Sequence, residues 1–124
     1  MIFKPELVNL ILAGKKTQTR RPLFYDIHGK VIPCRYKVGK TYAVQPGRGK
    51  HQVARIEILE VRRESWGAIS EPDAIAEGFT AGWADGIQRP AYWHFWEYVK
   101  GLYPTLDSTN ECWVLRFRRT GINQ

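Results

Sequence analysis

The sequence predicts a single small α+β domain, in which a few helices are inserted between strands that form an open or closed barrel. The chain has 124 residues, which suits one domain over residues 1–124. Hydrophobic residues make up 44% of the chain and charged residues 25%, so a core can form and a mainly disordered chain is disfavoured. Segments with strand-like alternation and segments with helical spacing follow one another, without repeats or low-complexity tracts.

The chain is predicted to open with a helix and a strand. Apolar residues at helical spacing predict a helix that begins at Pro5 and stops at Gly14. The alternating, β-branched segment 16–21 predicts a strand, and Pro22 ends it. Residues 23–37 then form a loop or a small hairpin that turns at His28-Gly29.

Two further strands are predicted in the middle of the chain. A turn over residues 36–40 leads into a strand over residues 41–45, and residues 46–50 form a flexible basic loop. A longer strand follows over residues 51–63, in which the apolar positions change parity between Ile58 and Leu59. We therefore expect a β-bulge there, which helps a strand bend around a small barrel.

The second half of the chain is predicted to contain two helices and a closing strand. Ser70 and the acidic residues after it have the form of a capping box for a short helix over residues 71–77. Glycine and proline predict a loop over residues 79–91. Helical spacing then predicts a helix over residues 91–102, and an apolar alternating segment predicts a strand over residues 112–118.

The charges are unevenly distributed along the chain. The formal net charge is +7, and residues 1–63 contain 14 lysines and arginines against 4 acidic residues, whereas residues 64–124 contain 5 against 8. A basic half on a small domain favours a phosphate-bearing partner, because clustered cations release condensed counterions from a nucleic acid. The alternative is a solvated basic face that serves solubility.

No metal, cofactor or membrane association is predicted. The two cysteines, Cys34 and Cys112, make neither a disulfide framework nor a metal site, and Cys112 has the surroundings of an inert core thiol. The three histidines lack metal-ligand spacing. No apolar run is long enough to cross a bilayer, and Lys4 and Glu6 interrupt any secretory signal, so a cytoplasmic location is expected.

The segment Leu12-Ala13-Gly14-Lys15-Lys16-Thr17-Gln18-Thr19-Arg20 resembles the signature of ASCH domains, which belong to the PUA-like superfamily. Three more segments are similar to that family's pattern: a glycine turn entering a strand over residues 38–44, the acidic helix end Ala76-Glu77-Gly78-Phe79, and the closing strand from Trp113 to Arg118. The resemblance covers nearly the whole chain. It implies a β-barrel core of about five or six strands with peripheral helices.

The activities known in this family diverge, so the resemblance implies more than one function. Some small bacterial members are amidohydrolases that remove the acetyl group from N4-acetylcytidine, with a lysine, a threonine three positions later and a distant glutamate as the catalytic set. Carried over by motif, these residues are Lys16, Thr19 and Glu77. Another member has been described as a ribonuclease, and PUA-like relatives often only bind RNA.

The sequence departs from those amidohydrolases in two respects. The enzymes are shorter and lack an aromatic insertion such as residues 79–98. They also tend to have apolar residues where Gln18 and Arg20 flank the threonine. A different substrate, or no catalysis, is therefore compatible with the resemblance.

Amide hydrolysis requires a nucleophile, a base and donors for the oxyanion. The Thr19 hydroxyl would attack, Lys16 would take its proton, and Glu77 would orient the lysine or pass a proton to the leaving amine. Burial and neighbouring cations would lower the pKa of Lys16, whereas Glu77 would raise it. In a regular strand Lys16 and Thr19 point to opposite faces, so they converge only if the strand begins after Lys16 or a bulge intervenes. The alternative is that neither residue is catalytic: Lys16 is then a solvated lysine, and Thr19 is a strand residue with high β propensity.

Further residues are candidates for binding a nucleic acid. Arg20 and Arg21 suit forked recognition of phosphate, and Arg48 and Lys50 supply a second basic loop. The alternative for Arg20 and Arg21 is that they are solvated residues of an edge strand, where their charges discourage pairing with another strand. Most aromatic residues between Trp83 and Tyr98 are expected to pack a helix onto the barrel, and Trp83 is the one expected to stack on a base.

The sequence therefore predicts an ASCH domain that binds RNA, a nucleotide or a modified nucleoside in a basic cleft between barrel and helices. The specific chemistry it favours is hydrolysis of the amide of an N-acylated base by Thr19 with Lys16 and Glu77. The alternatives are a non-catalytic RNA-binding module and a ribonuclease in which Lys16 acts as a base or stabilises charge.

Overall fold

A computed structural model of the chain describes residues 1–120, so residues 121–124, the last of the predicted domain, lie outside the described residues. The elements in chain order are α1 (Pro5–Leu12), β1 (Gln18–Pro22), β2 (Thr41–Val44), β3 (Ala54–Ser65), the 3-10 turn η1 (Trp66–Ala68), α2 (Glu71–Ala76), β4 (Gly82–Ala84), β5 (Ile87–Arg89), α3 (Ala91–Leu102) and β6 (Glu111–Thr120). The predicted α+β class is confirmed.

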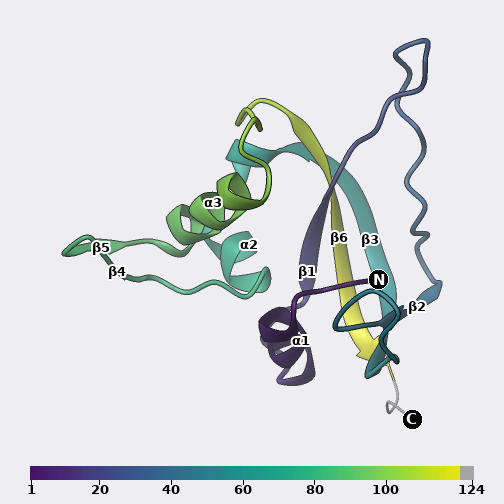
Figure 1. Ribbon diagram of the computed structural model, residues 1–124, viewed down its shortest axis with the longest axis horizontal. Helices are drawn as coiled ribbons and strands as arrows, with labels where there is room; N and C mark the ends of the chain where they lie inside the picture. The colour runs from purple at the N-terminus through teal and green to yellow at the C-terminus, as the bar shows by residue number, and fades with distance from the viewer. Residues whose placement is uncertain (121–124) are drawn as a thin grey trace.

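The strands are divided between two sheets. Four of them form an antiparallel sheet in the order β1-β6-β3-β2, and β4 pairs with β5 in a separate hairpin. Figure 1 shows β1, β6 and β3 side by side, with α2, α3 and the hairpin beyond the free edge of β1. No closed barrel is found among residues 1–120, where β1 and β2 are the two edge strands of the larger sheet.

The predicted β-bulge in β3 is confirmed, and it decides which residues face the helices. Ile58 and Glu60 pair with consecutive residues of β6, so Leu59 is the extra residue. Because neighbouring residues of β6 point to opposite faces, Ile58 and Glu60 do so too. Arg62 and Glu64 follow the parity of Glu60. The bulge thus directs two charged side chains away from the core that contains Ile58.

The sheet is covered on both faces, and β6 contributes to both cores. One core joins α1 to the sheet: Phe3, Val8, Ile11, Val44, Ala54, Ile56, Ile58, Leu115 and Phe117. The second core joins α2 and α3 to the other face: Trp66, Ala74, Ala91, Phe95, Val99, Cys112 and Val114. Burying both faces of β6 fixes the two helical layers relative to one strand.

The two helices of the second core are held together by capping interactions. The Ser70 side chain accepts a hydrogen bond from the Asp73 main-chain N–H (3.2 Å), so the predicted cap of α2 is confirmed. The Glu71 carboxylate accepts from the main-chain N–H groups of Ala91 (2.8 Å) and Tyr92 (3.0 Å) at the start of α3. A negative charge at that end also suits the helix dipole.

The prediction of a loop over residues 79–91 is wrong, because this segment contains the β4–β5 hairpin. Asp85 and Gly86 form its two-residue turn, and both have positive φ angles of 53° and 75°. Such a turn matches the twist of antiparallel strands. No helix among residues 1–120 has the length and apolar character needed to span a membrane.

Candidate functional site

A cavity of about 210 Å³ lies against the free edge of β1, and we call it the edge cavity. The N-terminal segment and α1 contribute to one side of it, and the end of α2 and α3 contribute to the other. Its polar lining residues are Lys4, Lys16, Thr19, Arg20, Arg21 and Glu77, and its aromatic ones are Phe3, Trp66, Phe79, Phe95, Tyr98 and Tyr103. Charged side chains and aromatic rings therefore line the same small cavity.

The position of the cavity explains how Lys16 and Thr19 both reach it. Strand β1 begins at Gln18, two residues after Lys16, so the strand does not impose its alternation on the lysine. An edge of a sheet is also accessible to side chains from both faces. The structure thus brings Lys16, Thr19 and Glu77 to the lining of one cavity.

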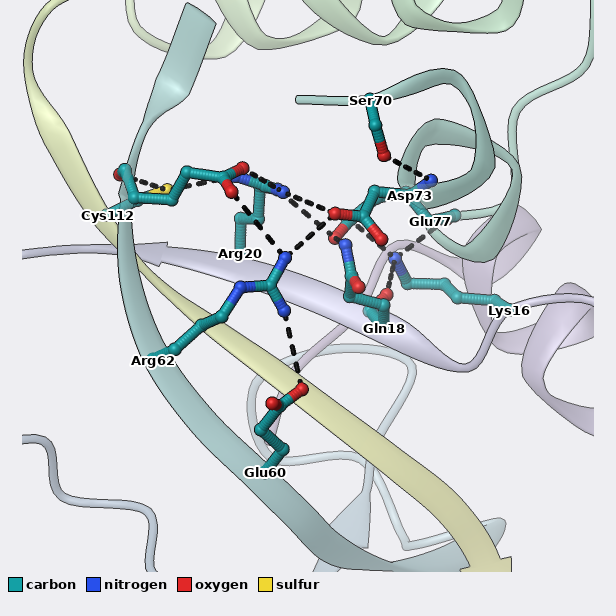
Figure 2. Close-up of polar contacts among 10 residues, drawn as sticks. Lys16, Gln18, Arg20, Glu60, Arg62, Ser70, Asp73, Glu77 and Cys112 are labelled. Atoms are coloured by element: carbon teal, nitrogen blue, oxygen red, sulfur yellow. Dashed lines mark hydrogen bonds and ion pairs between the residues drawn. The ribbon is translucent and has the colours of Figure 1, made fainter. Parts of the chain in front are cut away.

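Lys16 is almost completely buried, and its amine is held by three contacts. Lys16 Nζ donates to the main-chain oxygens of Gln18 and Glu77, both at 2.8 Å, and lies 3.4 Å from Glu77 Oε1 (Figure 2). Burial lowers the pKa of Lys16, and this effect outweighs the opposing effect of Glu77. Of the two opposing effects that the sequence left open, burial is therefore the larger, and the pKa of Lys16 is lowered.

Glu77 is the residue that follows α2, and its main-chain N–H still bonds to the Asp73 carbonyl (2.9 Å). Its Oε2 accepts a hydrogen bond from Gln18 Nε2 (3.2 Å), while its Oε1 faces Lys16. The Thr17 main-chain N–H bonds to the Ala76 carbonyl (2.8 Å) beside this contact. The end of α2 is thereby attached to the beginning of β1 at several points.

Thr19 is buried, with 5% of its surface exposed, and its side chain lines the edge cavity. Its hydroxyl has no hydrogen-bond partner within residues 1–120, and no hydrogen bond joins it to Lys16. The oxygen atom is not among the fully buried atoms that lack a partner, so it is accessible from the cavity, where a ligand can supply its partner.

Arg20 lies in a buried ionic network that sequence reasoning missed. Its Nη2 is 2.7 Å from Glu64 Oε1 and 3.5 Å from Asp73 Oδ2, and its Nε is 3.8 Å from Glu77 Oε2. The Glu64 contact is an ion pair whose N–H direction departs from that of a hydrogen bond. Arg62 donates to the same Asp73 oxygen at 2.8 Å, and Figure 2 shows both guanidinium groups meeting these carboxylates.

The other sequence candidates have different surroundings. Arg21 lines the edge cavity, with its guanidinium 4.9 Å from the Phe3 ring centre. Arg48 and Lys50 are exposed on the loop after β2, at the opposite edge of the sheet, and line none of the cavities described here. Trp83 is 73% exposed in the hairpin and lines none of them either.

The described part of the chain contains no group of three or more His, Cys, Asp or Glu side chains that could hold a metal ion. The cations of the edge cavity, together with its aromatic rings, suit an organic ligand that carries a phosphate or a polar ring.

Two solved structures have a similar fold. A protein from Enterococcus faecalis V583, of the family DUF984, is 21% identical with a TM-score of 0.63, over 96% of this chain and 72% of that one. An ASCH domain from Lactobacillus crispatus JV V101 is 23% identical with a TM-score of 0.58, over 92% of this chain and 70% of that one. These similarities show the fold alone.

No curated protein has a significant match to the chain. The family model described as "ASCH domain" matches residues 1–119, which is nearly all of the sequence. ASCH domains are thought to bind RNA. On the extent of this match, the chain belongs to the ASCH domain family.

Proposed function

We propose that the edge cavity binds one base of an RNA or of a modified nucleoside. The observation that carries this proposal is the shared lining of the cavity: Lys16, Thr19 and Glu77 lie around the same space as a set of aromatic rings. Single-stranded bases are recognised in this way, by stacking on rings and by hydrogen bonds to their edges.

The size of the cavity suits a single ring system. Its volume of about 210 Å³ is below the roughly 300–1,000 Å³ of sites for drug-sized ligands. Tyr98 and Phe79 are only partly buried, and their rings lie 5.4 Å apart between centres. These two rings give the cavity lining apolar surface on which a base can stack.

The polar groups of the cavity fit a base that carries an exocyclic amino group. A carboxylate such as that of Glu77 can accept a hydrogen bond from the N4 group of cytosine. Arg20 is already balanced by carboxylates, so Arg21 and Lys4 are the cations that remain for a phosphate.

The experiment that tests base binding compares two tyrosines of α3. Tyr98→Ala removes a ring of the edge cavity, whereas Tyr92→Ala removes an exposed ring of the same helix outside it. A stacked base contributes about 1–3 kcal/mol, so calorimetry with cytidine and N4-acetylcytidine should show roughly tenfold weaker binding for Tyr98→Ala alone. Equal losses in both variants, or no binding by the unmodified protein, would contradict the proposal.

A second candidate function is hydrolysis of the exocyclic amide of an N-acylated base. It is favoured by the Thr19 hydroxyl without a partner and by the lowered pKa of Lys16 at the same cavity. In its neutral form the Lys16 amine can donate its two short hydrogen bonds and still has a lone pair that accepts a proton.

In this reaction Thr19 Oγ1 attacks the acyl carbonyl carbon, and its proton passes to Lys16 Nζ. The C–N bond then breaks, the base amine leaves with that proton, and the acyl group remains on Thr19. Water attacks the ester, with Lys16 as base once more, and releases the carboxylic acid and the free hydroxyl.

Hydrolysis of N4-acetylcytidine by purified protein tests this second candidate. Thr19→Val and Lys16→Met should each abolish turnover, while Thr17→Val, which changes an exposed threonine two residues away, should retain it. Absence of turnover in the unmodified protein would exclude this substrate and leave base binding as the function to be tested.

A further inference from the structure

A second cavity lies next to the edge cavity, and we call it the loop cavity. Its volume is about 370 Å³, and it is formed largely by the segment that follows β1. The lining residues are Arg21, Pro22, Phe24, Ile32, Pro33, Cys34, Arg35, Tyr36, Tyr103 and Trp113. Arg21 and Tyr103 line both cavities, so the two cavities adjoin at these side chains.

Arg21 has the geometry of a phosphate ligand at this boundary. Its Nη2 donates to the Ile2 carbonyl (3.1 Å), and Phe3 supports the face of the guanidinium. Its Nη1 has no hydrogen-bond partner among the described residues and, unlike the unpartnered Nε, is not fully buried. An anchored guanidinium with an unused donor is suited to an anionic oxygen.

The lining of the loop cavity has the composition of a stacking site. Phe24, Tyr36, Tyr103 and Trp113 supply four aromatic rings, and Arg21 and Arg35 supply two cations without an acidic residue in the lining. Phe24 is 65% exposed although it is a large apolar residue. Aromatic rings next to positive charge are what binds successive bases of a single strand.

We infer that the loop cavity binds the nucleotide adjacent to the base in the edge cavity, with the connecting phosphate on Arg21. The natural ligand is then an oligoribonucleotide and not a free nucleoside. This inference rests on the proposed base binding in the edge cavity and adds a second subsite to it.

Cys34 gives a direct readout of the loop cavity. It is partly exposed and lines this cavity, whereas Cys112 is buried and burial raises the pKa of its thiol to about 11. Alkylation by iodoacetamide near neutral pH therefore reports on Cys34, because the thiolate is the reacting form. The dinucleotide cytidylyl-cytidine should slow this alkylation at least about fivefold, and cytidine should leave it unchanged.

Affinities measured on the same ligands complete the test. The dinucleotide should bind about tenfold more tightly than cytidine, as one more stacked base requires. Phe24→Ala should remove this gain and leave the affinity for cytidine unchanged. Tyr25→Ala is the matched control, since Tyr25 is the exposed neighbour of Phe24 and does not line the cavity.

The possible results separate the inference from the proposed function. Equal affinities for cytidine and the dinucleotide, with unchanged alkylation of Cys34, would overturn the second subsite and leave base binding in the edge cavity intact. If cytidine does not bind at all, the proposed function fails. Protection of Cys34 that Phe24→Ala abolishes would still support the loop cavity as a nucleotide site.

Discussion

Lys16 and Glu77 contact one another twice inside the protein: Lys16 Nζ lies 3.4 Å from the carboxylate Oε1 and 2.8 Å from the main-chain oxygen of Glu77. The side chains are 2% and 4% exposed, so water screens the pair little. The pair joins the beginning of β1 to the end of α2 across 61 residues of sequence. It therefore contributes to the shape of the edge cavity as well as to its charge.

The first prediction concerns the stability of this pair. Glu77→Gln should lower the free energy of unfolding by about 3 kcal/mol, because it leaves the buried Lys16 amine without its counter-charge. Lys16→Met should lower it by less, because Glu77 keeps Gln18 and Arg20 as partners. The double variant should lose less than the sum of the two, with a coupling energy on the order of 1–3 kcal/mol. Urea unfolding of the four proteins measures this cycle, and additive losses would show that the two side chains do not interact.

The second prediction is that Thr19→Val is neutral or stabilising. The substitution keeps the β-branched shape and removes a hydroxyl that has no hydrogen-bond partner within residues 1–120 and whose oxygen is not fully buried. We expect the free energy of unfolding to stay the same or to rise by up to about 1 kcal/mol in urea unfolding. A loss above about 1 kcal/mol would indicate that the hydroxyl is hydrogen-bonded in the folded protein.

The elements of this fold could largely be predicted from local signals. The Ser70 cap and the parity change at Ile58-Leu59 are features of adjacent residues, and both are found in the structure. The β4–β5 hairpin was also predictable, because Asp85-Gly86 is a common sequence for a two-residue turn between strands. The other glycine and proline residues of that segment favoured a loop.

The site was less predictable because it depends on where distant elements meet. Alternation along a regular strand would separate Lys16 from Thr19, and both line one cavity because β1 begins at Gln18, after Lys16. The ionic network around Arg20 requires Glu64 to point toward α2. The sequence predicted the bulge of β3, but no local pattern shows which element Glu64 faces after it. Arg48 and Arg20 were equally good binding candidates in the sequence, yet Arg48 lies at the opposite edge of the sheet.

The third prediction is a pH dependence of stability that Cys112 causes. The pKa of this thiol is raised from 9.0 to about 11, mainly by burial. A raised pKa in the folded state means that stability is fully present below pH 9 and is lost as the pH rises through about 11. Two pKa units correspond to roughly 2–3 kcal/mol.

Cys112→Ala isolates this effect, since alanine does not titrate. The unmodified protein should be the more stable of the two at pH 8 by the cost of the cavity that alanine leaves. This advantage should shrink between pH 9 and pH 11 in urea unfolding. A difference between the two proteins that is independent of pH would show that the thiol titrates normally.

The fourth prediction concerns Gly78, which follows Glu77 and has a φ angle of +109°. A Cβ atom at this position would lie 2.9 Å from Leu10 Cδ1 and 3.6 Å from Lys16 Cβ. Gly78→Ala should therefore lower the free energy of unfolding by about 1–3 kcal/mol, through backbone strain and crowding. It should also weaken binding of cytidine, because relief of the backbone strain at Gly78 moves Glu77, the residue before it.

Gly101→Ala is the matched control for this substitution. Gly101 lies in α3, where a Cβ atom would have no neighbour within 4 Å. Alanine in a helix is favoured over glycine by about 0.5–1 kcal/mol, so this variant should melt at a higher temperature than the unmodified protein. If both alanine variants are stabilised, the positive φ of Gly78 is not required by the fold. If only Gly101→Ala is, the turn after α2 needs glycine in order to hold Glu77 against Lys16.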